Sequence, residues 1–236
     1  MDIDHLIDEL ANHAKPVMRL PAPWRRAARW IAASLVYVGV VVAISVLVGG
    51  GLPGSIESHL VLELAAILAT AVAAAVAAFS SVIPGRDRRF LLLPLVPLGV
   101  WLATLGHGCL QDWQALGSAG LQVRADWDCA LPAVVLSVLP AGAMLSMLRR
   151  GAPLIPATSL ALGALAAAAM VNVGLRIFHA GDVSIQILAW HMGGAVVVAM
   201  IAAALGHRVL NWRAWVARAC RAELRLAPTA TYLKVR

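Results

Sequence analysis

Six long apolar runs, separated by short polar stretches, limit what this chain can fold into more than any other feature. A helix needs about 20 apolar residues to cross the hydrocarbon of a bilayer, and all but the third run approach that length. Backbone groups in lipid must be hydrogen-bonded within their own segment, which makes each run a helix. We therefore expect an all-α, polytopic membrane protein, a bundle of six transmembrane helices with short loops. The runs cover about residues 30–48, 60–83, 90–105, 129–148, 154–175 and 183–205.

Composition excludes the other broad classes of protein. Apolar types make up 61% of the 236 residues and charged types 13%, whereas soluble domains average about 45–50% and about 25%. The same numbers exclude a disordered chain. Three cysteines are too few for a disulfide scaffold, and the runs lack the alternation of barrel strands. The first run follows arginines, as a signal peptide does, but no convincing cleavage site follows, so we expect it to be retained.

The basic residues predict the orientation in the membrane. Of the 19 Lys and Arg residues, 17 fall in segments that share a side with the N-terminus. Because bases favour cytoplasmic loops, this split predicts that both termini are cytoplasmic. The two bases on the outer side are Arg124 and Arg176. The net charge of +7 is therefore a signal of topology, and we expect no direct contact with nucleic acid. The inner segments are residues 1–29, 84–89, 149–153 and 206–236.

The N-terminal residues depart from this basic pattern, because residues 1–14 carry four acidic side chains and no Lys or Arg. Their apolar residues recur with the spacing of one helix face, and Pro16 ends that helix. Such a helix could lie on the bundle or on the bilayer, but an acidic helix suits an anionic membrane surface poorly. A cytoplasmic protein with a groove for the apolar face is at least as good a partner. The face consists of Ile3, Leu6, Ile7 and Leu10, with Asp8 and Glu9 beside it.

The C-terminal tail has a different character. Val209, Trp212 and Val216 share one face of a predicted helix, while Arg218 and Arg221 lie on the other side. Tryptophans at headgroup level and arginines on phosphates are typical of an interfacial amphipathic helix. We therefore favour membrane anchoring over partner binding for this segment.

Small residues predict how the second run packs. Ala65, Ala69, Ala73 and Ala77 recur every four residues and so share one face of a helix. Small side chains let the backbones of membrane helices approach closely. We expect this face to pack inside the bundle.

The polar chemistry is concentrated on the predicted outer side. His107 and Cys109 begin the loop after the third run, Cys129 ends it, and His179 lies in the last outer loop. This spacing matches no standard zinc motif. A disulfide between the two cysteines, a metal or redox sensor built from them, and unpaired thiols all remain open. His191, about two turns into the sixth run, suits helix packing as well as ligation.

Short pieces of the sequence, none specific alone, occur in a characteristic order and spacing. Together they resemble the NrsF family of bacterial inner-membrane anti-sigma factors over nearly the whole chain. The pieces are Leu6–Ala11 with Lys15–Val17, Ile83–Arg86, Gly108–Leu110, Trp127–Cys129, Arg149–Pro153 and Ala189–His191.

The resemblance implies six spans and a cytoplasmic N-terminal segment that sequesters an extracytoplasmic-function sigma factor. We therefore expect residues 1–23 to be the sigma-binding segment and 24–207 the six-helix transmembrane domain, followed by the cytoplasmic amphipathic tail predicted above, 208–236. The implied sigma-binding residues are Ile3, Leu6, Ile7, Asp8, Glu9, Leu10 and Val17. The implied sensing residues, facing outward and responding to metal or oxidative stress, are Cys109, Cys129, His107, His179 and His191, of which all but His191 are candidate metal ligands.

One position departs from the family pattern. In the family a cysteine often follows the histidine of the last outer loop, whereas here Ala180 follows His179. This departure leaves the sensing chemistry to Cys109, Cys129 and the histidines.

We therefore expect a multi-pass anti-sigma factor of the bacterial inner membrane, not an enzyme. We expect no small-molecule substrate and no cofactor, a regulatory metal ion being the one exception. A membrane thiol oxidoreductase would need a CxxC pair with a redox role, and the sequence has none. A small transporter would need charged or polar residues at mid-membrane, which only Asn172 and His191 approach.

The charge split yields a direct test of topology. Reporter fusions after Gly117 should read periplasmic, and fusions after Arg150 or Arg225 should read cytoplasmic, because the bases mark the cytoplasmic segments. Activities of alkaline phosphatase and green fluorescent protein fusions measure the two sides. A periplasmic reading at Arg150 together with a cytoplasmic reading at Gly117 would reverse the orientation.

Overall fold

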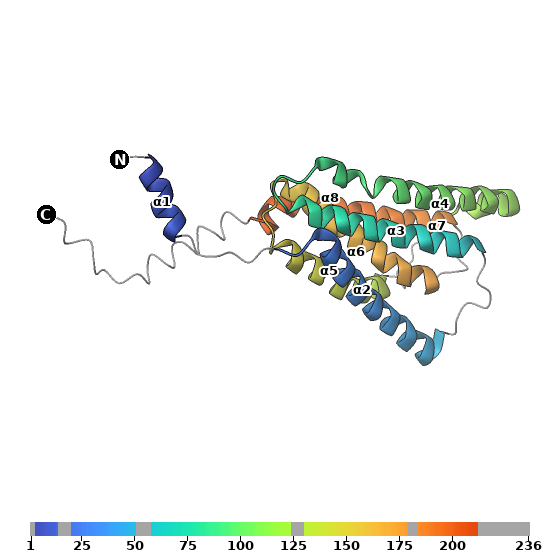
Figure 1. Cartoon of the computed structure of the whole chain (residues 1–236). Helices are drawn as coiled ribbons and strands as arrows, with labels where there is room; N and C mark the ends of the chain where they lie inside the picture. Colours follow the sequence, from blue (N-terminus) through green and yellow to red (C-terminus); the bar gives the residue numbers. More distant parts are fainter. Residues whose placement is uncertain (1–2, 14–19, 51–57, 124–129, 179–183, 212–236) are drawn as a thin grey trace.

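A computed structural model describes residues 3–13, 20–50, 58–123, 130–178 and 184–211 (Figure 1). This part of the chain consists of helices and turns and contains no strand. Six helices are long and apolar enough to cross a membrane, which confirms the predicted all-α bundle of six spans. They are Pro23–Val48, His59–Ser81, Arg88–Ala119, Leu131–Leu148, Pro156–Ile177 and Ser184–Val209.

A short helix precedes the bundle, and irregular turns extend several spans. A π-helical turn, Val46–Gly50, continues α2, and another, Leu188–Met192, joins α7 to α8. Single 3-10 turns, Arg88–Leu92 and Gly117–Leu121, flank α4. The helices are α1 (Ile3–His13), α2 (Pro23–Ser45), α3 (Ser58–Ser81), α4 (Leu95–Leu116), α5 (Ala130–Leu148), α6 (Pro156–Phe178), α7 (Ser184–Ile187) and α8 (Gly193–Val209).

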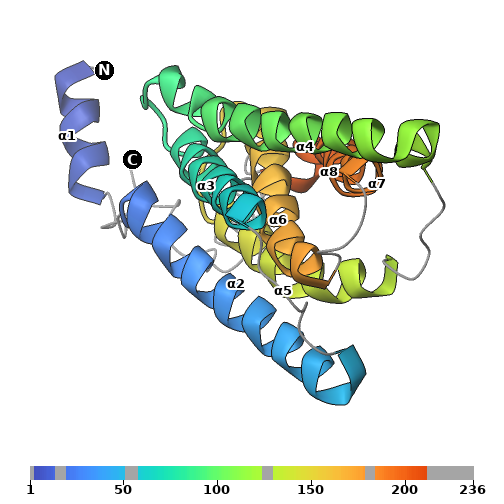
Figure 2. The same cartoon turned by 90° about the vertical axis from the view of Figure 1, so that its right-hand side faces the viewer.

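Helix α6 lies at the centre of the bundle and packs against α2, α3, α5 and α8 (Figure 2). Helix α3 is its main neighbour on one side and also contacts α2 and α4. The close approach of α8 to α6 depends on Gly206, where a Cβ would lie 2.5 Å from the Cα of Ala157. Small side chains allow such contacts where lipid supplies no hydrophobic drive between helices.

The predicted packing face of α3 is confirmed only towards the end of the helix. Ala77 is buried and Ala73 half-buried, whereas Ala65 and Ala69 are exposed and their neighbour Ala66 is buried instead. Nearly every residue of α3 is apolar, so the periodicity of alanine alone does not mark the inward face. Contacts with α2, α4 and α6 on several sides decide which alanines are buried.

Polar side chains tie α2 to α5 through backbone carbonyls. The Trp30 indole Nε1 donates to the carbonyl oxygen of Pro140 at 2.9 Å, and the Tyr37 hydroxyl donates to that of Val135 at 2.6 Å. An indole N–H without a hydrogen-bond partner in hydrocarbon would raise the free energy of the folded state by roughly several kcal/mol. These bonds therefore fix the register between the two helices.

The third span differs most from its predicted limits. The loop predicted to begin at Gly106 is wrong at its start, because α4 continues as helix to Leu116. Residues 106–116 include Leu110, Gln111 and Ala115, which are good helix formers, and no proline. Arg176, predicted above to lie in an outer loop, belongs to the last turn of α6, at the far end of that helix. The amphipathic tail falls outside the described residues beyond Asn211.

Candidate functional site

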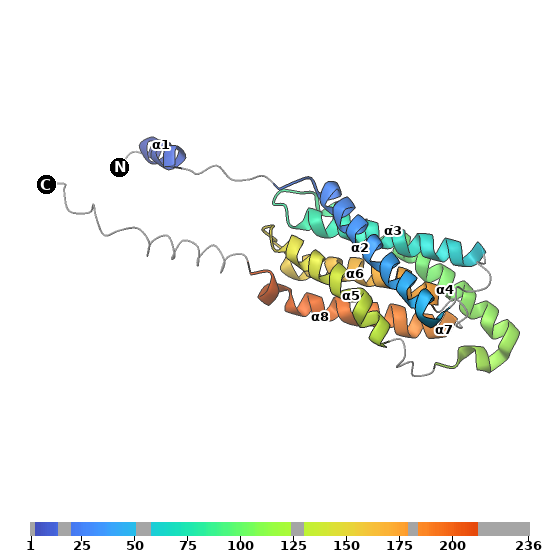
Figure 3. The same ribbon diagram turned by 90° about the horizontal axis from the view of Figure 1, so that it is seen from below.

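The bundle has two ends with different chemistry. Helix α2 begins and α8 finishes at one end, which we call the near end; the opposite end is the far end (Figures 1 and 3). At the near end the backbone N–H of Ala152 donates to the carbonyl of Val82 at 3.2 Å, joining the α5–α6 turn to the end of α3. Among the described residues, α1 lies beyond the near end, whereas the part of α4 that carries His107 and Cys109 lies towards the far end.

Helix α1 lies apart from the bundle, beyond its near end (Figures 1 and 3). Ile3 and Ile7 are 73% and 57% exposed, so the bundle does not cover their face of the helix. Asp8 and Glu9 are exposed as well. The apolar face of an isolated helix is in contact with water. Binding in the groove of a partner would bury that face and so stabilise the complex.

Some predicted sigma-binding residues are described only in part. Leu6 and Leu10 occupy helical positions in α1, but their side chains are not among those described. Val17 lies outside the described residues. The predicted apolar face thus rests on Ile3 and Ile7 in this structure.

The predicted sensing residues do not form one cluster in the described structure. His107 is exposed and Cys109 is a half-buried free thiol, both on the far part of α4. His191 is buried in the π-helical turn before α8. Cys129 and His179 lie outside the described residues. Within the described ranges, no group of three His, Cys, Asp or Glu side chains is placed to hold a metal ion.

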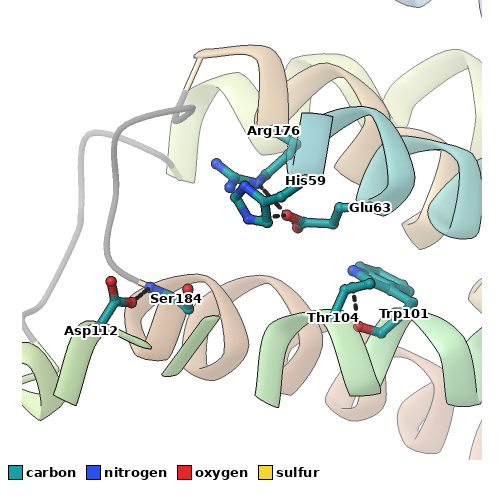
Figure 4. Close-up of polar contacts among 7 residues, drawn as sticks. All are labelled: His59, Glu63, Trp101, Thr104, Asp112, Arg176 and Ser184. Carbon is teal, nitrogen blue, oxygen red and sulfur yellow. Dashed lines mark hydrogen bonds and ion pairs between the residues drawn. The ribbon is translucent and has the colours of Figure 1, made fainter. Parts of the chain in front are cut away.

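The part of α4 that carries Cys109 packs closely on the start of the last span. A Cβ at Gly108 would lie 2.2 Å from the Ser184 hydroxyl, so a larger residue there would displace the Ser184 side chain. One turn further, the Asp112 carboxylate accepts a hydrogen bond from the backbone N–H of Ser184 at 2.7 Å (Figure 4). A carboxylate at the first residue of a helix satisfies an N–H that the helix cannot. Cys109 therefore adjoins a tight joint between α4 and α7.

A buried ion pair, which the sequence analysis did not predict, joins α3 to α6 near the far end. The Arg176 Nε lies 3.0 Å from both carboxylate oxygens of Glu63, and the two side chains are 3% and 1% exposed (Figure 4). His59 Nε2 lies 3.9 Å from the same carboxylate. One sequence signal could have revealed the pair. Glu63 and Arg176 have opposite charges and both lie near the far ends of their helices.

A second buried cation lies at the near end. Arg26 is 3% exposed, and its guanidinium carbon lies 4.6 Å from the centroid of the Phe79 ring. Its Nη2 donates to the carbonyl of Met147, while Nη1 has no hydrogen-bond partner among the described residues. Cation–π contacts strengthen when desolvated. Arg26 thus connects the start of α2 with α3 and α5, directly after the segment that carries α1.

Comparison with known proteins identifies a family for most of the chain. A family model described as negative regulator of sigma F matches residues 10–212. No curated protein and no solved structure matches the chain. The match covers all six spans, and the chain therefore belongs to the NrsF family of negative regulators of sigma F.

Proposed function

We propose that this protein is an anti-sigma factor of the bacterial inner membrane that sequesters an extracytoplasmic-function sigma factor through α1. Family membership supplies the negative regulation of a sigma factor. The observation that supports binding through α1 is its exposed apolar face, which lies apart from the bundle. Sequestration needs no catalysis, so the protein acts as a stoichiometric regulator.

The proposed binding mode is a helix docked in a groove of the sigma factor. Ile3 and Ile7 would enter the groove, and Asp8 and Glu9 would face its rim. Surfaces that bind nucleic acid are basic, so a carboxylate-bearing helix suits a sigma surface that DNA would otherwise contact. Occupying that surface prevents the sigma factor from working with polymerase.

The proposed orientation places the near end in the cytoplasm. Arg25, Arg29, Arg86 and Arg150 all belong to near-end segments, and bases favour the cytoplasmic side. This orientation brings α1 to the compartment of its partner and exposes the far end to the periplasm. Cys109 and His107, with Cys129 and His179, would then sense a metal or an oxidant there.

The proposed signal passes along packed helices. A chemical change at Cys109 would shift the joint of Gly108 with Ser184 and so the last span, which packs on α6. Helix α6 contacts α2, whose first turn Arg26 holds in place beside the sigma-binding segment. A signal shifts such a bundle only if it binds the two states with different affinity.

Substitution on α1 tests the proposed function. Ile7→Asp should weaken sigma binding roughly tenfold or more, because burying such a side chain contributes about 1.5–3 kcal/mol. The matched control is Asn12→Asp, which adds the same charge on the opposite face of α1 and should bind like the wild type. Titration of the purified sigma factor onto protein in nanodiscs measures both. Equal affinities for the two variants would contradict the proposal.

Substitution of the ion pair tests the link between α3 and α6. Glu63→Gln or Arg176→Gln alone should destabilise the bundle by about 3–5 kcal/mol, because each leaves one charge buried and unpaired. The double variant should recover much of that loss. Thermal unfolding in detergent measures the cycle. Additive losses would mean that the two side chains do not act as a pair.

The cysteines test the proposed sensor. Cys109→Ser and Cys129→Ser should alter the response to metal or oxidant without abolishing sigma binding, because α1 lies at the other end of the bundle. Cys220→Ser, in the tail, is the control and should respond like the wild type. Mass shifts after thiol alkylation, with and without inducer, count the free thiols. More free thiols with inducer mean that the signal breaks a disulfide, and fewer mean that it forms one. Wild-type responses in both serine variants, with no mass shift, would place the sensor elsewhere.

A further inference from the structure

A groove of about 620 Å³ lies between α5, α6 and α8. This volume falls within the range of small-molecule sites, about 300–1,000 Å³. Its floor is the side of α6 that carries Ala164, Ala167 and Ala168, while α5 and α8 form its walls. It reaches from Trp190 and His191 to Val209, which is nearly the whole length of the last span.

The polar side chains of the groove lie on the far half of its three helical segments. Ser137, Asn172 and His191 come from α5, α6 and the turn before α8, and the rest of the described lining is apolar apart from the Trp190 indole. Each lies in the half of its span that is nearer the far end. We call these three side chains the polar belt.

The belt contains an unsatisfied acceptor. Asn172 is 4% exposed, and its Nδ2 donates to the carbonyl of Ala168 at 2.8 Å, one turn earlier. Its Oδ1 has no hydrogen-bond partner among the described residues. A buried acceptor without a partner is costly, and a bound O–H group removes that cost. Because Asn172 lines the groove, a donor bound there would lie beside this amide.

The ligand that fits must combine three properties: a long apolar tail, an uncharged polar head that sits below the membrane interface, and a hydrogen-bond donor. We propose that the groove binds an isoprenoid quinol, with a ring hydroxyl donating to Asn172 and the tail lying over Ala164 towards the near end. Trp190, 37% exposed, offers an aromatic surface beside the ring.

The alternatives fit less well. A phospholipid phosphate belongs at the interface and seeks basic residues, yet no charged residue is among the described residues that line the groove. Its acyl chains carry no donor for Asn172. A helix of a second copy would fill the apolar length of the groove but would leave the acceptor unsatisfied unless it placed a donor at that depth.

The donor requirement makes the site selective for redox state. A quinol has O–H donors, whereas the oxidised quinone has only acceptors. Wild-type protein should therefore bind the quinol roughly three- to tenfold more tightly than the quinone, the gain of one net hydrogen bond. This inference does not depend on sigma binding.

Binding to purified protein in nanodiscs tests the proposal, with decylubiquinol and decylubiquinone as probes under anaerobic conditions. Asn172→Leu should remove the preference for the quinol. Ala168→Leu should reduce binding of both probes at least tenfold by filling the groove, while Ala33→Leu, on an exposed position of α2, should bind like the wild type. Thermal unfolding in detergent identifies a variant that fails to fold. In that case the ratio of quinol to quinone affinity in the wild-type protein tests the proposal by itself.

Four results would overturn the proposal. The first is equal or tighter binding of the quinone by the wild type. The second is unchanged binding in a folded Ala168→Leu protein. The third is a solvent extract of purified protein that yields phospholipid but no quinone or quinol. The fourth is a dimer in nanodiscs that Ala168→Leu dissociates, because a second copy would then occupy the groove.

Discussion

The lack of water in the bilayer is the constraint on which the rest of this structure depends. Polar groups inside the bundle are costly without partners within the protein, and several of them find those partners on other helices. Arg176 with Glu63 joins α6 to α3, and Trp30 with Pro140 joins α2 to α5. Apolar packing against lipid would not select these neighbours, because lipid tails are as apolar as the side chains. The polar contacts therefore specify which helices meet and in which register.

The existence of six spans could be predicted from sequence because length and hydropathy are local properties. The end of the third span could not, since residues 106–116 mix polar and apolar types that suit either a loop or a helix end. The inward face of α3 could not be predicted either, because apolar residues occur on all sides of this helix and their spacing does not mark one face. The partnership of Glu63 with Arg176 depends on how helices distant in sequence pack.

The candidate sites divide in the same way. The amphipathic face of α1 follows from spacing alone, and Ile3 and Ile7 are exposed as a binding face requires. Residue type groups His191 with the cysteines, but the fold places it in the groove with Asn172. Residue type predicts what chemistry a side chain can do, whereas tertiary packing decides which neighbours it has. Spacing within one helix therefore predicts which residues share a face, whereas residue type alone does not predict which helices meet.

Helix α6 connects the features that matter for regulation. It carries Arg176 of the ion pair, Asn172 of the polar belt and the small residues that α8 packs on. A ligand in the groove contacts α5, α6 and α8 together, so it favours the spacing of these helices that fits it. Because Arg26 bonds to the carbonyl of Met147 in α5, that spacing also affects the first turn of α2. Under the proposed function, a ligand in the groove and a periplasmic signal would thus both act through the packing of α2 on its neighbouring helices before they affect α1.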